Sequence, residues 1–457
     1  MDPVQLFHDV ADSVPAYRAF LASHGADPRS TPFHDLPLTT KDTYTRRYPL
    51  PNLCRGGVIG DMIAVSSGST GEPSFWPRSA ADERVIADRF EEVFDTFESR
   101  SRRTLAVVCF ALGTWVGGLF TLNCVRHLAE RGHRLTAIAP GSDRREILRV
   151  IPPLAPHFDQ VVLLGYPPFL KDVIDAGSGW PAYNLKLVTA GEVFSEEWRT
   201  LVCERAGIAD PVRSTASLYG TADAGVLGNE TPLSIELRRF LSARPDLARR
   251  LFGESRLPTL VQYDPGVRYF EEHAGTLVFT GDNGIPLIRY HIADEGGLIP
   301  YADMLTYAKS HGLTPSAPGP EHPFAYVFGR SHFTVSYYGA NIYPENIAIG
   351  LEQPEISGSV TGKFVMEVEE DTTHDRHLNP HPATPPEQRV HRLRPRTPPN
   401  PTDPPTRNRR PHLLPTRHQT PLHPPTPVTP TRAPALERRA RPCRATPTRA
   451  RTPPPRS

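Results

Sequence analysis

A cluster of small polar residues follows an apolar run near residue 65. The stretch "AVSSGSTGEP", residues 64–73, holds three serines, a threonine and two glycines between Ser66 and Gly71. Backbone N–H groups without bulky neighbours, together with short hydroxyls, suit the oxygens of a polyphosphate. The stretch is not a Walker loop, because Glu72 and Pro73 stand where that motif needs a lysine and a hydroxyl. A plain surface loop is the alternative interpretation.

The elements around this serine-rich loop predict an α/β fold. The sequence after it, "SAADERVIADRFEEVFDTF", has helical spacing, and the runs "TLAVVCFAL", "RLTAIAP", "QVVLLGY" and "LKLVTAG" resemble buried strands. Helix-length segments separate these runs, which predicts a mostly parallel sheet with helices on both faces. Ligands of such sheets lie beyond the carboxyl ends of the strands. From about residue 255, "GTLVFT" and "PLIRYHIAD" flank "GDNGI", which predicts an antiparallel hairpin and a smaller antiparallel subdomain.

The near-neutral net charge of +1 hides two unlike parts of the chain. Residues 371–457 hold 23 of the 52 prolines and 17 arginines, but no lysine and five acidic residues. The segment therefore carries about +12, and residues 1–370 carry about −11. A segment of this composition buries too little apolar surface to fold, so we expect a disordered tail.

Cysteine usage and the amino-terminal residues predict a cytoplasmic protein. The five cysteines form no C-x-x-C pair, which favours reduced, structural thiols. The start, "MDPVQLFHDVADSV", carries acids where a signal peptide needs basic residues. Residues 105–125 lack charge over a length that could span a bilayer, but "GTWVGG" interrupts them. We therefore expect a strand, a turn and a helix there, with a membrane segment as the alternative.

Three segments together resemble the acyl-adenylate-forming superfamily, most closely its phenylacetate-CoA ligase branch. The first combines "SSGSTGEP" with the preceding arm "LPLTTKDTYTRRYPL", residues 36–50, which also has the pattern of a helix capped by Thr39 or Thr40. The resemblance covers roughly residues 15–370 and implies that the loop binds the phosphates of ATP, with Thr70 also catalytic. The implied phosphate-binding residues are Ser66, Ser67, Gly68, Ser69, Thr70 and Gly71.

The second segment is "ASLYGTADAG", residues 216–225, preceded by "LKLVTAGEVFSEEW". The resemblance places the adenine and ribose of ATP against Gly191, Glu192, Tyr219, Gly220 and Thr221. The acid that ends a Tyr-Gly-x-x-acid motif helps to hold magnesium in this family, and Asp223 occupies that position as a shorter side chain. A turn or cap residue is the alternative role for Asp223.

The third segment comprises "IRYHIAD" and "FGR". A carboxylate can accept both hydroxyls of a ribose, and the resemblance gives this role to Asp294, with Arg330 as a cationic donor to the ribose or phosphate and as a catalytic residue. The nearby "TGD", residues 280–282, imitates a superfamily motif but falls in the expected hairpin turn.

Several positions depart from the family pattern. Glu72 stands where lysine is common, and the pivot of the carboxyl-terminal cap reads Gly329-Arg330-Ser331-His332, which assigns the hinge to His332. The family's cap continues further and delivers a lysine, whereas the last lysine here is Lys363. We expect an adenylation domain over 1–329, a partial cap over 330–370 and the tail over 371–457. A truncated or frameshifted cap would explain this ending and would reduce activity.

The resemblance implies an AMP-forming acid–thiol ligase. ATP and Mg²⁺ would convert a carboxylic acid to an acyl-AMP, and coenzyme A, or alternatively a carrier-protein thiol, would take the acyl group. Apolar and aromatic residues in "GTWVGG", "LLGYPPF" and the loop after Gly191 favour an aryl or medium-chain acid. We expect no membrane and no specific nucleic-acid partner, and a homodimer stays open. The alternative is a non-catalytic nucleotide- or acyl-binding protein whose basic tail docks on an anionic partner.

Overall fold

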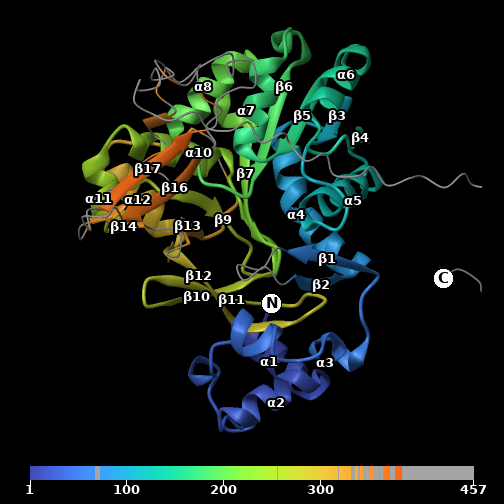
Figure 1. The fold of residues 1–457 in the computed structure, drawn as a ribbon, viewed down its shortest axis with the longest axis vertical. Coiled ribbons are helices and arrows are strands. Elements are labelled where there is room, and N and C mark those ends of the chain that lie inside the picture. The colour runs from blue at the N-terminus through green and yellow to red at the C-terminus, as the bar shows by residue number, and fades with distance from the viewer. Residues whose placement is uncertain are drawn as a thin grey trace, which may run out of the picture. The chain divides into compact units, whose positions relative to one another are not determined.

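The computed structural model describes most of the chain up to residue 382. The residues outside this description are 67–72, 255, 317–318, 331–334, 338–339, 343–346, 348–349, 352, 354–355, 357–359, 361–363, 371–375 and 383–457. The predicted α/β class is confirmed: helices flank a large sheet, one half of which consists of parallel strands (Figure 1).

A helical segment begins the chain. Asp2 caps α1 (Pro3–Ser13) by accepting hydrogen bonds from the backbone N–H groups of Val4 and Gln5. Phe7, Tyr17 and Phe20 are buried between α1, α2 (Pro15–Ser23) and the residues before α3 (Leu50–Leu53). The arm then makes a short π-type helix, Lys41–Thr45, and Thr40 caps it with its hydroxyl.

The serine-rich loop connects the two strands of a hairpin. Strand β1 (Met62–Ser66) pairs antiparallel with β2 (Ser74–Arg78), and Ser66 lies opposite Ser74. Trp76, on β2, is fully buried. Alternate residues of a strand point to the same face, and Trp76 lies on the face of β2 that packs against the amino-terminal core. The loop itself, including Ser67, Gly68, Ser69, Thr70 and Gly71, lies outside the described residues.

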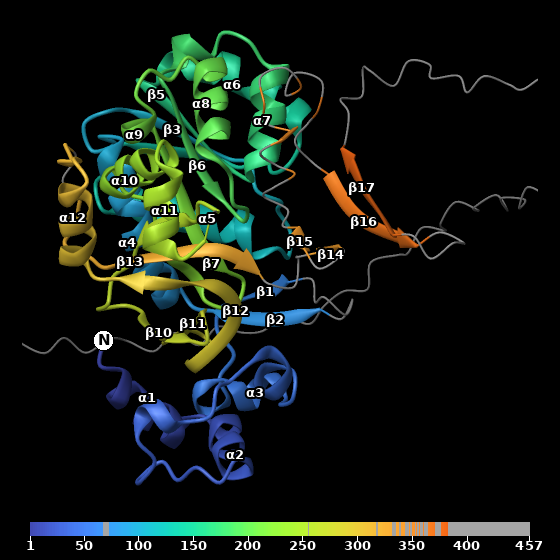
Figure 2. The same ribbon diagram turned by 90° about the vertical axis from the view of Figure 1, so that its left-hand side faces the viewer.

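Five parallel strands and five flanking helices form the expected crossover arrangement. Leu105, Leu163 and Leu187 face one side of the sheet, where α6 to α8 cover them, while Ala106 and Val162 face α4 and α5 (Figures 1 and 2). The strands Thr104–Val108 and Gln160–Gly165 are buried along their whole length, which explains their continuous apolar runs. The strands are β3 (Thr104–Val108), β4 (Leu135–Ile138), β5 (Gln160–Gly165), β6 (Leu185–Ala190) and β7 (Thr215–Thr221). The helices are α4 (Ala80–Thr96), α5 (Val116–Glu130), α6 (Arg144–Leu154), α7 (Pro167–Ala176) and α8 (Glu196–Ala206).

The expected antiparallel strands continue this same sheet. Its order is β10-β11-β12-β13-β9-β8-β7-β6-β5-β3-β4, and the direction reverses between β7 and β8. The predicted hairpin is formed by β11 and β12, with "GDNGI" at its turn. The antiparallel strands are β8 (Gly225–Asn229), β9 (Thr259–Gln262), β10 (Tyr269–His273), β11 (Thr276–Gly281), β12 (Leu287–Ile299) and β13 (Phe324–Arg330). The remaining helices of this half are α9 (Pro211–Ser214), α10 (Pro232–Ser242), α11 (Pro245–Phe252) and α12 (Tyr301–Ser310).

Short hairpins follow β13. Strand β14 (Val335–Tyr337) pairs with β15 (Ala340–Ile342), and β16 (Phe364–Glu370) pairs with β17 (Arg376–Pro382). Strand β17 lies beyond residue 370, where the sequence predicts that folding ends. Its prolines fit because β17 is the edge of a two-stranded ribbon, where a missing N–H is tolerated.

The apolar stretch over residues 105–125 forms β3, a turn and the start of α5, as expected. Within the described part of the chain, no helix is long and apolar enough to cross a membrane.

Buried cysteines generate a prediction about thiol reactivity. Cys54, Cys109, Cys124 and Cys203 are buried free thiols, and burial raises the pKa of each, that of Cys203 to about 11. A thiol with a pKa near 11 is only about one-thousandth ionised at pH 8, and the thiolate is the reactive form. We expect iodoacetamide at pH 8 to modify these four residues on the order of a hundred times more slowly in the folded chain than in urea. Equal rates by peptide mass spectrometry would contradict this burial.

Candidate active site

Tyr219 and Asp294 meet although they lie far apart in the sequence. The Tyr219 hydroxyl, near the carboxyl end of β7, donates a hydrogen bond of 2.8 Å to Asp294 Oδ2 on β12. Asp294 is 5% exposed and stands opposite Arg330 in the pairing of β12 with β13. The structure therefore brings together three positions to which the sequence assigns adenine and ribose contacts.

Asp223 lies on the turn between β7 and β8 and is 2% exposed. The Tyr290 hydroxyl donates a 2.6 Å hydrogen bond to Asp223 Oδ2, and Lys41 Nζ lies 3.2 Å from Oδ1. The Arg78 guanidinium also donates to the main-chain carbonyl oxygens of Ala222 and Asp223, at 2.6 and 3.0 Å. Burial lowers the pKa of Arg78, an effect that Asp82 and Asp223 oppose. This turn is thus held by two cations and a phenol.

Local backbone geometry fixes the turn. A Cβ on Gly220 would lie 2.6 Å from the Gly225 carbonyl oxygen, so a larger residue cannot pack there. Thr221 Oγ1 accepts a 3.1 Å hydrogen bond from the Ala224 N–H. Both residues therefore shape the turn that carries Asp223.

Strand β12 has two backbone irregularities next to its site residues. Arg289 and Ala293 have φ values of 46° and 61°, and they directly precede Tyr290 and Asp294. The left-handed region is strained for residues with a Cβ and is concentrated at functional sites. The pairing of β12 with β11 and with β13 also shifts register along this strand. These irregularities set the directions in which the Tyr290 and Asp294 side chains leave the strand.

Gly191 and Glu192 follow β6 at the carboxyl edge of the parallel strands. Gly191 has φ 93°, a conformation that favours glycine. The hydroxyl of Tyr166, which follows β5, donates a hydrogen bond to Glu192 Oε2. These residues therefore lie at the edge where α/β sheets bind ligands.

The remaining predicted residues are only partly described. Ser66 Oγ accepts a 2.9 Å hydrogen bond from Trp76 Nε1. Arg330 is described by its strand pairing alone, and His332 lies outside the described residues, as do Thr70 and the rest of the loop. Asp282, the acid of "TGD", pairs with Arg55 at 3.0 Å at the hairpin turn.

The sequence interpretation missed Lys41, Tyr290 and Arg78. Lys41 belongs to the arm, and Thr39 connects that arm to β12 through a 3.1 Å hydrogen bond to Arg289 O and a 2.8 Å bond from His291 N. Lys41 Nζ also lies 5.5 Å from the centre of the Trp76 ring. The motif "LTTKDTY" marks the arm, but no local signal shows that its lysine reaches Asp223.

Asp223 can supply one oxygen to a magnesium ion. Among the described residues, Asp223 Oδ1 accepts no hydrogen bond, although it faces Lys41. Magnesium is commonly held by one or two carboxylates together with substrate phosphates and water. The donor set thus fits a metal bound jointly with ATP, and the Lys41 ammonium would have to share that oxygen or move.

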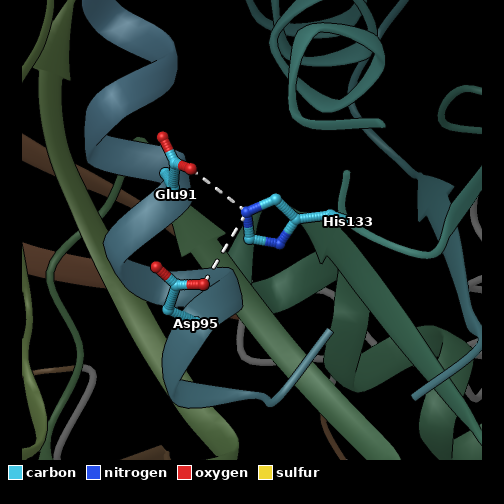
Figure 3. Close-up of side chains that lie close together, drawn as sticks. All are labelled: Glu91, Asp95 and His133. Carbon is cyan, nitrogen blue, oxygen red and sulfur yellow. Dashed lines mark hydrogen bonds and ion pairs between the residues drawn. The ribbon is translucent and has the colours of Figure 1, made fainter. Parts of the chain in front are cut away.

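A second group of potential ligands lies elsewhere, between α4 and the residues after α5. Oxygens of Glu91 and Asp95 approach His133 Nε2 at 3.2 and 3.7 Å (Figure 3). Arg100 pairs with both carboxylates, and Arg131 pairs with Glu91. Burial raises the pKa of Glu91, but hydrogen bonds from Arg131 and His133 outweigh it and leave that pKa below its ordinary value. Arginines therefore balance these acids, and the group is a structural network.

Comparison with solved structures identifies the fold. The chain is similar to 2-hydroxyisobutyryl-CoA ligase in its postadenylation state, at TM-score 0.59 and 16% identity over 83% of this chain and 77% of the other. An open conformation of that ligase with 2-HIB-AMP and CoA matches at TM-score 0.55 and 15% identity, over 83% and 82%. No protein-family model matches the chain, and no curated protein matches it in sequence. The chain therefore shares the fold of this CoA ligase.

The ion pair between Lys41 and Asp223 generates a stability prediction. Lys41→Met would leave a buried carboxylate without its cation, so we expect the free energy of unfolding to fall by about 1–3 kcal/mol. Urea denaturation followed by circular dichroism measures this change. Lys309→Met, in the last turn of α12, removes an exposed lysine and serves as the control. An equal effect of the two substitutions would show that the pair contributes nothing specific.

Proposed function

We propose that the protein activates a carboxylic acid with ATP to an acyl-AMP and then transfers the acyl group to coenzyme A. The observation that carries this proposal is the buried Asp294 carboxylate, held by Tyr219 opposite Arg330. A carboxylate and a phenol ring at this position can recognise the hydroxyls of a ribose and the face of an adenine. The shared ligase fold supports the same reaction.

Each end of ATP would contact a different part of the site. The adenine would lie near Gly191, Glu192 and Tyr219, and the ribose hydroxyls would bond to Asp294 and Arg330. The triphosphate would extend toward Ser66 and the serine-rich loop at the tip of β1 and β2. Magnesium, held in part by Asp223, would offset phosphate charge when bound.

The reaction would proceed by two displacements. In the first, a carboxylate oxygen of the acid attacks the α-phosphorus, an O–P bond forms, and the bond to the leaving pyrophosphate breaks. The Lys41 ammonium lies beside Asp223. It can stabilise the negative charge that develops in the transition state, because preorganised donors are effective in this role. In the second, the thiolate of coenzyme A attacks the acyl carbon and AMP leaves.

The finer assignments form part of the same proposal. We place the protein in a phenylacetate-CoA ligase-like branch with an aryl or medium-chain acid as substrate, and we assign adenylation to residues 1–329. Residues 330–370 would form a partial cap that turns about His332, and an incomplete cap would slow the second displacement more than the first. A cytoplasmic location fits the buried free thiols.

Substitution of Asp294 tests the nucleotide site. Asp294→Ala removes the proposed acceptor of the ribose hydroxyls, so ATP binding should weaken by about 1.5–3 kcal/mol, the range for hydrogen bonds to charged groups. Isothermal titration calorimetry on the full chain measures the dissociation constant. Asp303→Ala, on the exposed first turn of α12, should leave it unchanged. An unaltered constant for Asp294→Ala would refute the ribose assignment.

Pyrophosphate release tests the chemistry. With ATP and magnesium, we expect release to require an added acid and to be faster with phenylacetate or hexanoate than with acetate. A coupled phosphate assay across a panel of acids measures the rates, with Asp294→Ala as the impaired reference. ATP binding without acid-dependent pyrophosphate release would instead favour the non-catalytic nucleotide-binding alternative.

A further inference from the structure

Two buried arginines bind the main chain of the β7–β8 turn. Arg78, at the end of β2, donates to the carbonyl oxygens of Ala222 and Asp223 at 2.6 and 3.0 Å. Arg268, which directly precedes β10, donates to the next carbonyl oxygen, that of Ala224, at 3.2 Å. Guanidinium groups therefore hold three successive carbonyl groups of the turn that carries Asp223.

Burying Arg268 costs free energy. It is 3% exposed, and its hydrogen-bond partners among the described residues are the neutral oxygens of Val267, Ala224 and Asn283. Burial, together with the charge of Arg78, lowers the pKa of Arg268 to about 10. A buried cation without a carboxylate partner destabilises a fold. Its contact with the turn therefore indicates a role beyond packing.

The hairpin turn between β11 and β12 fixes the Arg268 side chain. Asn283 in this turn is 6% exposed, and its Oδ1 accepts a 2.7 Å hydrogen bond from Arg268. A Cβ on Gly281 would lie 3.0 Å from Arg268 Cδ and 3.1 Å from its Nε, so the arginine crosses the turn where glycine leaves room for it. The "TGDNG" sequence, residues 280–284, thus supports Arg268 on its way to the β7–β8 turn.

The same hairpin also holds the Asp223 side chain. Tyr290, on β12, donates a 2.6 Å hydrogen bond to Asp223 Oδ2, while Arg268 holds the carbonyl group of the following residue, Ala224. The described hydrogen bonds of Arg268 reach the main chain of the turn and not the carboxylate, so Arg268 acts on Asp223 through the backbone. Arg78 also interacts with the Asp223 charge, so Arg268 gives the cleaner test of position.

We propose that Arg268 is a positioning residue for Asp223 in its role as a magnesium ligand. It holds the main chain at Ala224 and thereby keeps Asp223 Oδ1 available to magnesium that binds together with ATP. This inference rests on the proposed function, because it concerns the part of nucleotide binding that depends on the metal. The adenine and ribose contacts, which that proposal gives to Tyr219 and Asp294, do not require Arg268.

Nucleotide binding tests this role. Arg268→Met removes the guanidinium and keeps most of the side-chain stem. We expect it to weaken binding of ATP with magnesium at least fivefold and to change binding of metal-free AMP less than twofold, as measured by isothermal titration calorimetry on the full chain. Arg89→Met removes another buried arginine, on α4, and should preserve both constants. Unchanged ATP binding by Arg268→Met, or equal weakening for ATP and AMP, would overturn the proposal.

Amide hydrogen exchange without nucleotide tests the contact itself. Arg268→Met and Asn283→Leu should each speed exchange in residues 221–225 at least threefold, and Arg89→Met should not. The double variant should exchange no faster than Arg268→Met alone, because both substitutions act through one contact. Thermal melting checks that every variant folds. Unchanged exchange in both single variants would overturn the proposal.

The two experiments separate the inference from the proposed function. If the wild-type chain binds neither nucleotide, the proposed function fails, and exchange still shows whether Arg268 holds the turn. If the wild-type chain binds ATP with magnesium and Arg268→Met binds it equally well, the proposed function stands and the role of Arg268 is refuted.

Discussion

The contact of the arm with β12 and Asp223 is the constraint on which the candidate site depends. Thr39 exchanges backbone hydrogen bonds with Arg289 and His291, and this places Lys41 3.2 Å from a buried carboxylate. Asp223 would be costly in the interior without that cation and the Tyr290 hydroxyl. The amino-terminal segment is therefore part of the site, although it contributes no strand to the main sheet.

Strand β12 contributes one side chain to each of two hydrogen-bonded pairs in the site. Tyr290 holds Asp223 and Asp294 accepts from Tyr219, so one strand contacts both the turn after β7 and the end of β7 itself. The left-handed residues Arg289 and Ala293 direct these two side chains. Residues four apart already share a face of a regular strand, so the two irregularities adjust where these side chains lie along β12 and not which face they occupy. Local strain thus serves to position polar groups at the point where the sheet changes from parallel to antiparallel.

Much of the fold could be predicted because the signals are local. Runs such as "QVVLLGY" mark strands buried on both faces, and Ser79 with Asp82 caps α4 where the sequence places a helix. The meeting of Tyr219 with Asp294 followed from the family resemblance, since no spacing rule connects β7 with β12. Lys41, Arg78 and Tyr290 were missed because their partners are distant in sequence. The continuation of the antiparallel strands in the main sheet was missed for the same reason: pairing partners such as β9 and β13 are chosen by tertiary packing.

Hydrogen exchange of the full chain with and without ATP and magnesium tests the central claim most directly. If the arm, the end of β6, the β7–β8 turn and β12 form one nucleotide site, ATP should slow exchange together in residues 39–45, 185–193, 216–230 and 288–296. Protection should be much weaker in helix α12, which lies outside these segments. Protection of the β7–β8 turn without any change in the arm and β12, or no protection at all, would contradict the account.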